Sequence, residues 1–248
     1  MLLAAGLFCG FVNALVSSGS AVSLPVLIFL GLPSTVANGT NRLAILAGAL
    51  SSLVAFQRRG AVDWRRSLRL CIPCVAGSVL GAWLASVLDA NQVGWVVVIV
   101  LVVALATVTL TQRLAPPAQS EEGQTLRIRG RHDLLFVAIG GWAGFIGAHS
   151  AIAILLALVL GLGFNIIQAN AAKALLLVAV GLSSIAVFGA TAEVNWGYGV
   201  CMSVGGVAGG WAGGCLATYG RINKWMPRLL VVTVLAELVQ LVAAMVVR

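Results

Sequence analysis

The sequence predicts an all-α polytopic membrane protein with two inverted four-segment repeats, each beginning with a broken or re-entrant helical hairpin. Three observations predict this fold class: an apolar composition, a duplication at one offset, and an uneven distribution of charge among the loops. The 248 residues are 60% hydrophobic and 9% charged, whereas soluble domains are about 25% charged. Several charge-free stretches reach the roughly 20 residues that cross a bilayer. These stretches are 1–41, 70–88, 90–112, 134–172 and 194–220.

The composition also excludes some classes of protein. A formal net charge of +8 would suit nucleic acid, but the arginines cluster in short loops, as is typical of cytoplasmic loops beside anionic lipid headgroups. The helices lack paired carboxylates, a His-rich cluster and a Ser–His arrangement, so an intramembrane enzyme is disfavoured. A membrane anchor for a partner protein would leave charged mid-membrane residues unexplained. We expect no catalytic residue, no metal, no cofactor and no nucleic-acid partner.

A duplication relates the two halves of the chain. Asn38 of the first half corresponds to Asn170 of the second. The same offset in numbering pairs Gly31 with Gly163, Phe56 with Phe188, Trp64 with Trp196, Gly77 with Gly209, and Gly81 with Gly213. One register held over that length indicates an internal repeat. We therefore divide the chain into a first transmembrane repeat at 1–112, a cytoplasmic linker at 113–133 and a second transmembrane repeat at 134–248.

Each repeat is expected to begin with a helical hairpin. In the first, Ser17-Ser18-Gly19-Ser20 separates apolar pieces at 3–16 and 21–31. In the second, Gly147-Ala148-His149-Ser150 separates 134–146 from 151–162. Pieces of this length rise roughly 16–21 Å, less than a hydrocarbon core of about 30 Å. We favour re-entrant hairpins, with kinked spanning helices as the alternative, because irregular backbone at that depth must be buried or line a wet cavity.

Longer helices complete the two repeats. Pro33 and Ser34 are typical of a helix start, and the apolar pattern continues to about Gln57. The other predicted helices are 70–88, 93–112, 166–188, 198–218 and 226–247.

Loop charge predicts that the repeats are inverted. The loops at 58–69, 113–133 and 221–228 are basic, and the loops with Asp89 and Glu193 are not. Basic short loops stay cytoplasmic. The last two basic loops share a side only if an even number of crossings separates them, which holds if the segment at 134–162 enters and leaves on one side. The halves then have opposite orientations, as in many secondary transporters.

Polar residues at the head of the second segment of each repeat predict an anion site. Asn38, Asn41 and Arg42 share one helix face, as do Asn170 and Lys173. These heads and the hairpin tips should all lie roughly 10–16 Å deep, so we expect them to meet in one cavity near the bilayer centre. Cations, amide donors and inward-pointing helix N-termini would attract an anion there.

The candidate substrate-binding residues combine both heads and both tips. They are Ser18, Gly19, Ser20, Asn38, Thr40, Asn41, Arg42, His149, Ser150, Asn170 and Lys173. Intramembrane charge is functional by default; the alternative is that Arg42 and Lys173 snorkel to an interface while the asparagines cap or join helices. Glu237 and His149 are candidates for carrying a coupled proton, with structural pairing and helix capping as their alternatives.

The chain resembles the TauE/SafE sulfite exporter family over essentially its whole length. The segments that carry the resemblance are GFVNALV at 10–16, LGLP at 30–33, ANGTNR at 37–42, GFIG at 144–147 and NAAK at 170–173. The Asn-Gly-Thr-Asn-Arg element is the most specific of them. The family tends to be Gly-rich at the hairpin tips, where this chain has Ser-Ser-Gly-Ser and Gly-Ala-His-Ser. The resemblance implies an eight-segment permease, usually of the bacterial inner membrane, that exports sulfite or related organosulfur anions.

The expected function is therefore export of small sulfur-containing anions, such as sulfite or organosulfonates, by alternating access around a cationic site at the bilayer midplane. The alternative is an uncoupled anion channel. The exact anion, the direction of transport, the coupling ion and the oligomeric state do not follow from the sequence.

Overall fold

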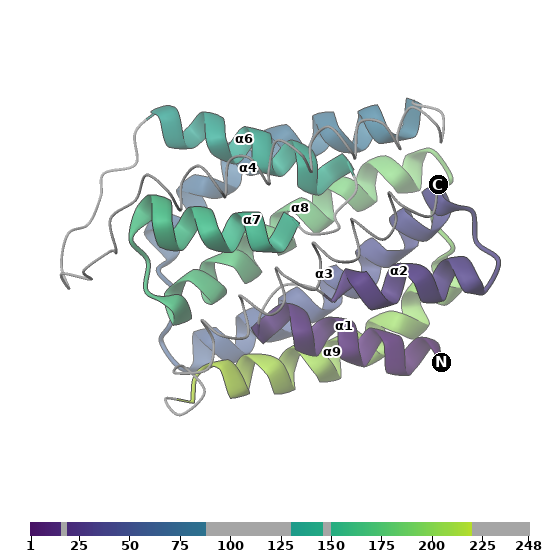
Figure 1. Cartoon of the computed structure of the whole chain (residues 1–248), viewed down its shortest axis with the longest axis horizontal. Coiled ribbons are helices and arrows are strands. Elements are labelled where there is room, and N and C mark those ends of the chain that lie inside the picture. Colours follow the sequence, from purple (N-terminus) through teal and green to yellow (C-terminus); the bar gives the residue numbers. More distant parts are fainter. Residues whose placement is uncertain (16–18, 88–129, 146–149, 220–248) are drawn as a thin grey trace, which may run out of the picture.

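A computed structural model describes residues 1–15, 19–87, 130–145 and 150–219, and this part of the chain is helical apart from connecting turns (Figure 1). Its helices are α1 Leu2–Leu15, α2 Ser20–Phe29, α3 Ser34–Arg58, α4 Trp64–Val87, α6 Gly130–Phe145, α7 Ser150–Leu156 with its π-helical continuation η1 Ala157–Gly161, α8 Ile166–Ala190 and α9 Trp196–Ala217. The predicted all-α class is confirmed. The predicted helices at 93–112 and 226–247, most of the linker, and the candidates Ser18, His149 and Glu237 lie outside the described residues.

Four of these helices are long and apolar enough to cross a membrane: α3, α4, α8 and α9. Many large apolar side chains on the outside of the bundle are exposed, for example Phe29 at 79% and Ile72 at 76%. A soluble protein rarely exposes apolar surface on this scale, whereas lipid is an apolar solvent for it.

Two helices begin earlier than the sequence predicts. Helix α4 begins at Trp64 instead of residue 70, and α9 begins at Trp196 instead of residue 198. The Oδ1 atoms of Asp63 and Asn195 each accept a hydrogen bond, 3.1 Å long, from the backbone N–H three residues on. The prediction places each helix start at the first residue of the apolar run. The cap lets the helix begin earlier, in the segment before that run.

The first two helices fold back along each other. Ser23 Oγ lies 3.6 Å from Cys9 Sγ, and the backbone N–H of Gly19 donates to Asn13 Oδ1 over 3.1 Å. Contacts that advance along α2 while they recede along α1 mean that the two helices are antiparallel. Helices α6 and α7 also run back along each other, and their open end lies at the opposite end of the bundle from that of α1 and α2 (Figure 1).

The backbone repeats itself at the offset found in the sequence. The bounds of α3 and α8 are separated by this offset at both ends, since Ser34 corresponds to Ile166 and Arg58 corresponds to Ala190. The residues with positive φ fall into two pairs at the same offset. These pairs are Gly31 (89°) with Gly163 (68°), and Gly60 (65°) with Ala192 (57°). The duplication therefore extends to turn conformation.

Helix packing crosses the boundary between the halves of the chain. Helix α1 packs on α9, and α6 packs on α4. Both pairs approach through glycines: a Cβ on Gly209 would lie 1.9 Å from Leu7 O, and a Cβ on Gly77 would lie 2.0 Å from Val137 O. Small residues allow such close approach where lipid offers no hydrophobic drive. The long helix α4 of the first half thus packs on the first hairpin helix of the second half, and α9 of the second half packs on the first hairpin helix of the first half.

Helices α3 and α8 pack against each other at the centre of the bundle. A Cβ on Gly39 would lie 3.3 Å from Phe188 Cβ, and a Cβ on Gly181 would lie 3.3 Å from Leu46 Cβ. The contact therefore advances along α3 as it recedes along α8, so these two helices are antiparallel.

Candidate functional site

The polar motif Asn38–Arg42 lies in the second turn of α3. Pro33 precedes the helix with a φ of −55°, which suits a helix start. Arg42 is 3% exposed, and Lys173, one residue before the counterpart of Arg42 in α8, is 1% exposed. Both cationic side chains are therefore enclosed by the helices around them.

Arg42 binds the C-terminal end of α6. Its Nη1 donates to the carbonyl oxygen of Ala143, and its Nη2 donates to Gly144 O over 2.9 Å. Asn38, one turn earlier on the same face of α3, accepts from Arg42 Nη2 at Oδ1 over 3.4 Å and donates from Nδ2 to Phe145 O over 3.0 Å. Two side chains of α3 therefore engage three successive carbonyls of α6.

This arrangement adds a contact that the sequence does not predict. The sequence predicts the positive N-termini of the second hairpin helices near the cations, and in the structure Arg42 contacts the C-terminus of a first hairpin helix. The last carbonyls of a helix lack intrahelical partners and carry the negative end of the helix dipole. The guanidinium of Arg42 supplies hydrogen-bond donors to these carbonyls and a positive charge to this end of the dipole, which explains its position.

The two residues between Asn38 and Asn41 hold a different element. Thr40 Oγ1 accepts a hydrogen bond from the backbone N–H of Asn195 over 2.9 Å. A Cβ on Gly39 would lie 2.1 Å from Glu193 O, so only glycine permits this approach. The predicted ligand Thr40 thus anchors the loop between α8 and α9 to α3.

The second head is a buried amine–amide pair. Lys173 Nζ donates to Asn170 Oδ1 over 2.6 Å, and Asn170 Nδ2 donates to Ile166 O over 3.1 Å. Asn170 is 0% exposed. Both side chains lean toward the N-terminus of α8, as Arg42 and Asn38 lean toward the N-terminus of α3.

The structure does not bring the two cations together. Given the antiparallel contacts of α3 and α8, the part of α8 level with Arg42 is near Ile185. Lys173 precedes that level by about 12 residues, which is about 18 Å at the helical rise. The side chains also lean apart, so a small anion does not touch both at once in this conformation. The merged cavity expected from the sequence stays a prediction, and in this conformation its two cations lie at separate levels of the α3–α8 pair.

The remaining candidates are also buried or packed. Ser20 is 3% exposed and Ser150 is 1% exposed. Gly19 is pressed against α1, where a Cβ would lie 2.2 Å from Cys9 O. Asn41 is 2% exposed, and its Oδ1 has no hydrogen-bond partner among the described residues.

Comparisons with known proteins identify the family. The family described as "Sulfite exporter TauE/SafE" matches residues 2–241. The chain belongs to the TauE/SafE family. It is 29% identical to the "Probable membrane transporter protein" of Haemophilus influenzae, over 84% of this chain and 81% of that protein. It is 27% identical to the "Probable membrane transporter protein ORF9" of Sinorhizobium sp, over 98% and 91%.

A further relative is the "Probable membrane transporter protein YfcA" of Escherichia coli K12, 27% identical over 80% of this chain and 73% of that protein. No solved structure matches the chain. With its apolar helices, this family membership makes the chain a multi-pass membrane transporter of the TauE/SafE type.

In this TauE/SafE transporter the structure adds a hydroxyl cluster that was not predicted from the sequence. Ser78 Oγ on α4 lies 3.1 Å from Ser184 Oγ and 3.0 Å from Ser183 Oγ on α8. The backbone of Ser78 abuts Gly144, one of the residues that Arg42 holds. The repeat offset carries a signal for this cluster, because Ser51-Ser52 corresponds to Ser183-Ser184.

The loop between α8 and α9 carries a partly desolvated carboxylate. Glu193 Oε2 is enclosed and has no hydrogen-bond partner in the described parts of the chain. This desolvation raises the pKa of Glu193 above its ordinary value, against an opposing hydrogen bond from Thr191. The residue as a whole is half-buried.

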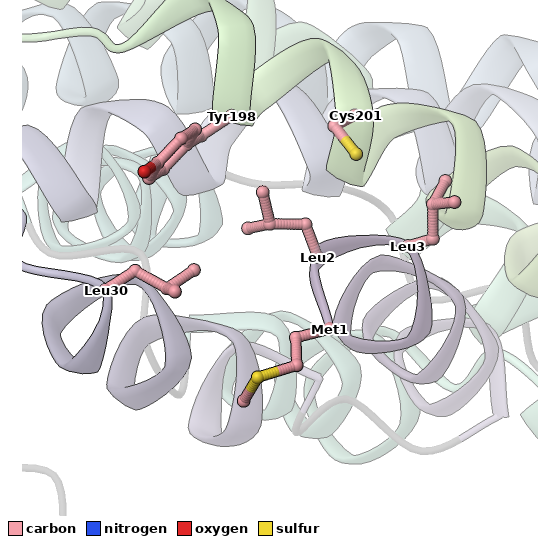
Figure 2. A pocket seen from close by; sticks show the side chains of 6 residues that line it. All are labelled: Met1, Leu2, Leu3, Leu30, Tyr198 and Cys201. Carbon is pink, nitrogen blue, oxygen red and sulfur yellow. The ribbon is translucent and has the colours of Figure 1, made fainter.

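A recess of about 330 Å³ lies at the open end of the first hairpin (Figure 2). It is lined by Met1, Leu2, Leu3, Leu30, Tyr198 and Cys201. The side chains of this lining are apolar except for the Tyr198 hydroxyl and the Cys201 thiol. The lining includes neither cationic head.

Proposed function

We propose that this protein is a transporter, in the export direction, of small sulfur-containing anions such as sulfite or organosulfonates. Transport proceeds by alternating access in the cell inner membrane. The family match and the three named relatives support transport. The family description supplies sulfite as the first substrate to test.

The observation that carries the proposal is the buried charge of Arg42, which forms no ion pair with a carboxylate of the described residues. Its hydrogen-bond acceptors are the carbonyls of Ala143 and Gly144 and the amide of Asn38, all neutral groups. Its Nε has no acceptor anywhere in the described chain. Burying a charge beside neutral partners alone is costly, and a small anion at Nε would offset that cost. Lys173 is the second head, at the other end of the antiparallel α3–α8 pair.

Two opposed heads suit alternating access better than one merged site. We propose that the repeats are inverted, with each hairpin opening to a different side. The antiparallel α3 and α8, the matched positive-φ residues and the opposite open ends of the hairpins support this arrangement (Figure 1). An anion would pass from one cationic head to the other as the hairpins move.

Flux measurements test the heads. We expect Arg42→Ala and Lys173→Ala to abolish sulfite flux into proteoliposomes, because each removes a buried cation. Arg42→Lys should retain only part of the flux, because an ammonium lacks the planar two-point grip of a guanidinium. Ser51→Ala serves as the matched control, since its hydroxyl bonds to Val207 O on another face of α3. Normal flux in both alanine variants, with unchanged elution on gel filtration, contradicts the proposal.

The same assay separates a transporter from an uncoupled channel. Saturable flux that responds to an imposed pH gradient indicates coupled transport. Flux that rises linearly with anion concentration and ignores the gradient indicates a channel.

A further inference from the structure

Both ends of the Asn38 amide already form hydrogen bonds within the protein, unlike a side chain that is free to bind an anion. Its amide bridges two groups: Oδ1 accepts from Arg42 Nη2, and Nδ2 donates to Phe145 O. The bond to Arg42 is the longest of the guanidinium's three, at 3.4 Å. The bridge joins the cation of α3 to the last residue of α6 within hydrogen-bonding distance.

The guanidinium as it stands cannot grip an oxyanion at two points. A two-point grip uses two N–H groups on one edge of the guanidinium, such as Nε–H with one Nη–H. Nη2 uses both of its N–H groups, one toward Gly144 O and one toward Asn38 Oδ1, whereas Nε has no acceptor in the described residues. An anion that accepts from Nε–H and from Nη2 on the same edge must therefore displace one of these two acceptors. The hydrogen bond to Asn38 Oδ1 is the longest of the three, so it is the easiest to displace. A charged oxygen is also a stronger acceptor than a neutral amide.

We propose that Asn38 is an anion-released latch on the second hairpin. This inference rests on the proposed anion site at Arg42. The arriving anion replaces Asn38 Oδ1 at Arg42 Nη2, the Asn38 amide turns away, and Phe145 O loses its donor. The last turn of α6 is then free to move. Anion binding at α3 is thereby coupled to the position of the hairpin that packs on α4.

A latch and a ligand predict opposite effects of Asn38→Ala on the affinity for sulfite. If Asn38 bound the anion, Asn38→Ala would weaken binding. Because the latch must open before the two-point grip forms, removing it relieves a conformational cost. We expect Asn38→Ala to bind sulfite about fivefold more tightly than the wild type, which corresponds to the net contribution of about one hydrogen bond. Isothermal titration of purified full-length protein with sodium sulfite measures this.

Hydrogen exchange tests the latch without any anion. We expect the backbone amides of residues 140–145 to exchange faster in anion-free Asn38→Ala than in the wild type or in Ser51→Ala. Wild-type protein saturated with sulfite should approach the exchange of the variant. Unchanged exchange in anion-free Asn38→Ala overturns the latch, and so does weaker sulfite binding. If the wild type binds no sulfite, the proposed function fails, and the anion-free exchange still decides whether the latch exists.

Discussion

At the scale of the residue, the motif Asn38–Arg42 divides its work between two neighbours. Asn38 and Arg42 bind the end of α6, whereas Gly39 and Thr40 hold the loop between α8 and α9. The corresponding residues of the second repeat include Ala171 and Ala172 in place of Gly39 and Thr40, so that repeat has no matching hydroxyl for the loop at 58–64. The two heads therefore differ in the loop contacts that they make as well as in their cations.

A backbone position gives a test at this scale. Ala192 has a φ of 57°, and Gly60 occupies the corresponding turn with a φ of 65°. A side chain in this conformation costs about 1–2 kcal/mol relative to glycine. We expect Ala192→Gly to raise the unfolding temperature in detergent and Gly60→Ala to lower it, as measured by intrinsic fluorescence.

The two substitutions control each other. Apart from its neighbours in the chain, none of the described residues has an atom within 4 Å of a Cβ built on Gly60, so the effect of the substitution is on the backbone. Equal stability of Gly60→Ala and the wild type would show that the strain is absorbed elsewhere.

At the scale of the element, the existence of the helices could be predicted, but their partners could not. The apolar runs and the polar breaks predict where helices form and where the chain turns, because both are local properties. The partner of a helix depends on which faces fit. Gly77 and Gly209 are visible as small residues in the sequence, but nothing local says that they meet Val137 and Leu7.

The same limit explains why the contacts of Arg42 could not be predicted. The sequence places a cation near a hairpin tip, but the tip has a positive helix end and a negative one. Only the tertiary structure shows that the guanidinium donates to the carbonyls of Ala143 and Gly144. The same applies to Thr40, whose residue type suits a ligand and whose hydroxyl instead accepts from Asn195 N.

The glycine contacts give a test of helix pairing. A Cβ at Gly209 would lie 1.9 Å from a backbone oxygen of α1, so Gly209→Ala must push the two helices apart. We expect a loss of about 1–3 kcal/mol of stability, in the range of overpacked cores, read as a lower midpoint in thermal gel-filtration assays. Gly161→Ala is the matched control, because no other helix of the described structure has an atom within 4 Å of its Cβ. Equal losses in the two variants would contradict the close approach.

At the scale of the whole molecule, the inverted arrangement predicts opposite accessibility for matched loops. Arg59 and Thr191 occupy the turns after α3 and α8, and both are exposed. Because α3 and α8 are antiparallel, these turns lie at opposite ends of the bundle. With the native cysteines replaced, we expect an impermeant maleimide to label Thr191→Cys in intact cells and Arg59→Cys only in inverted vesicles. Labelling of both from one side would refute the inverted repeat.

The exchange of helices between the halves bears on how the chain is made. Helix α1 leaves the ribosome well before its glycine-lined partner α9, which begins only at Trp196. Until α9 arrives, the close-packing face of α1 can meet only lipid or provisional neighbours. Insertion of the first hairpin must therefore precede its final docking, and a chain interrupted before α9 would leave that face open in the bilayer.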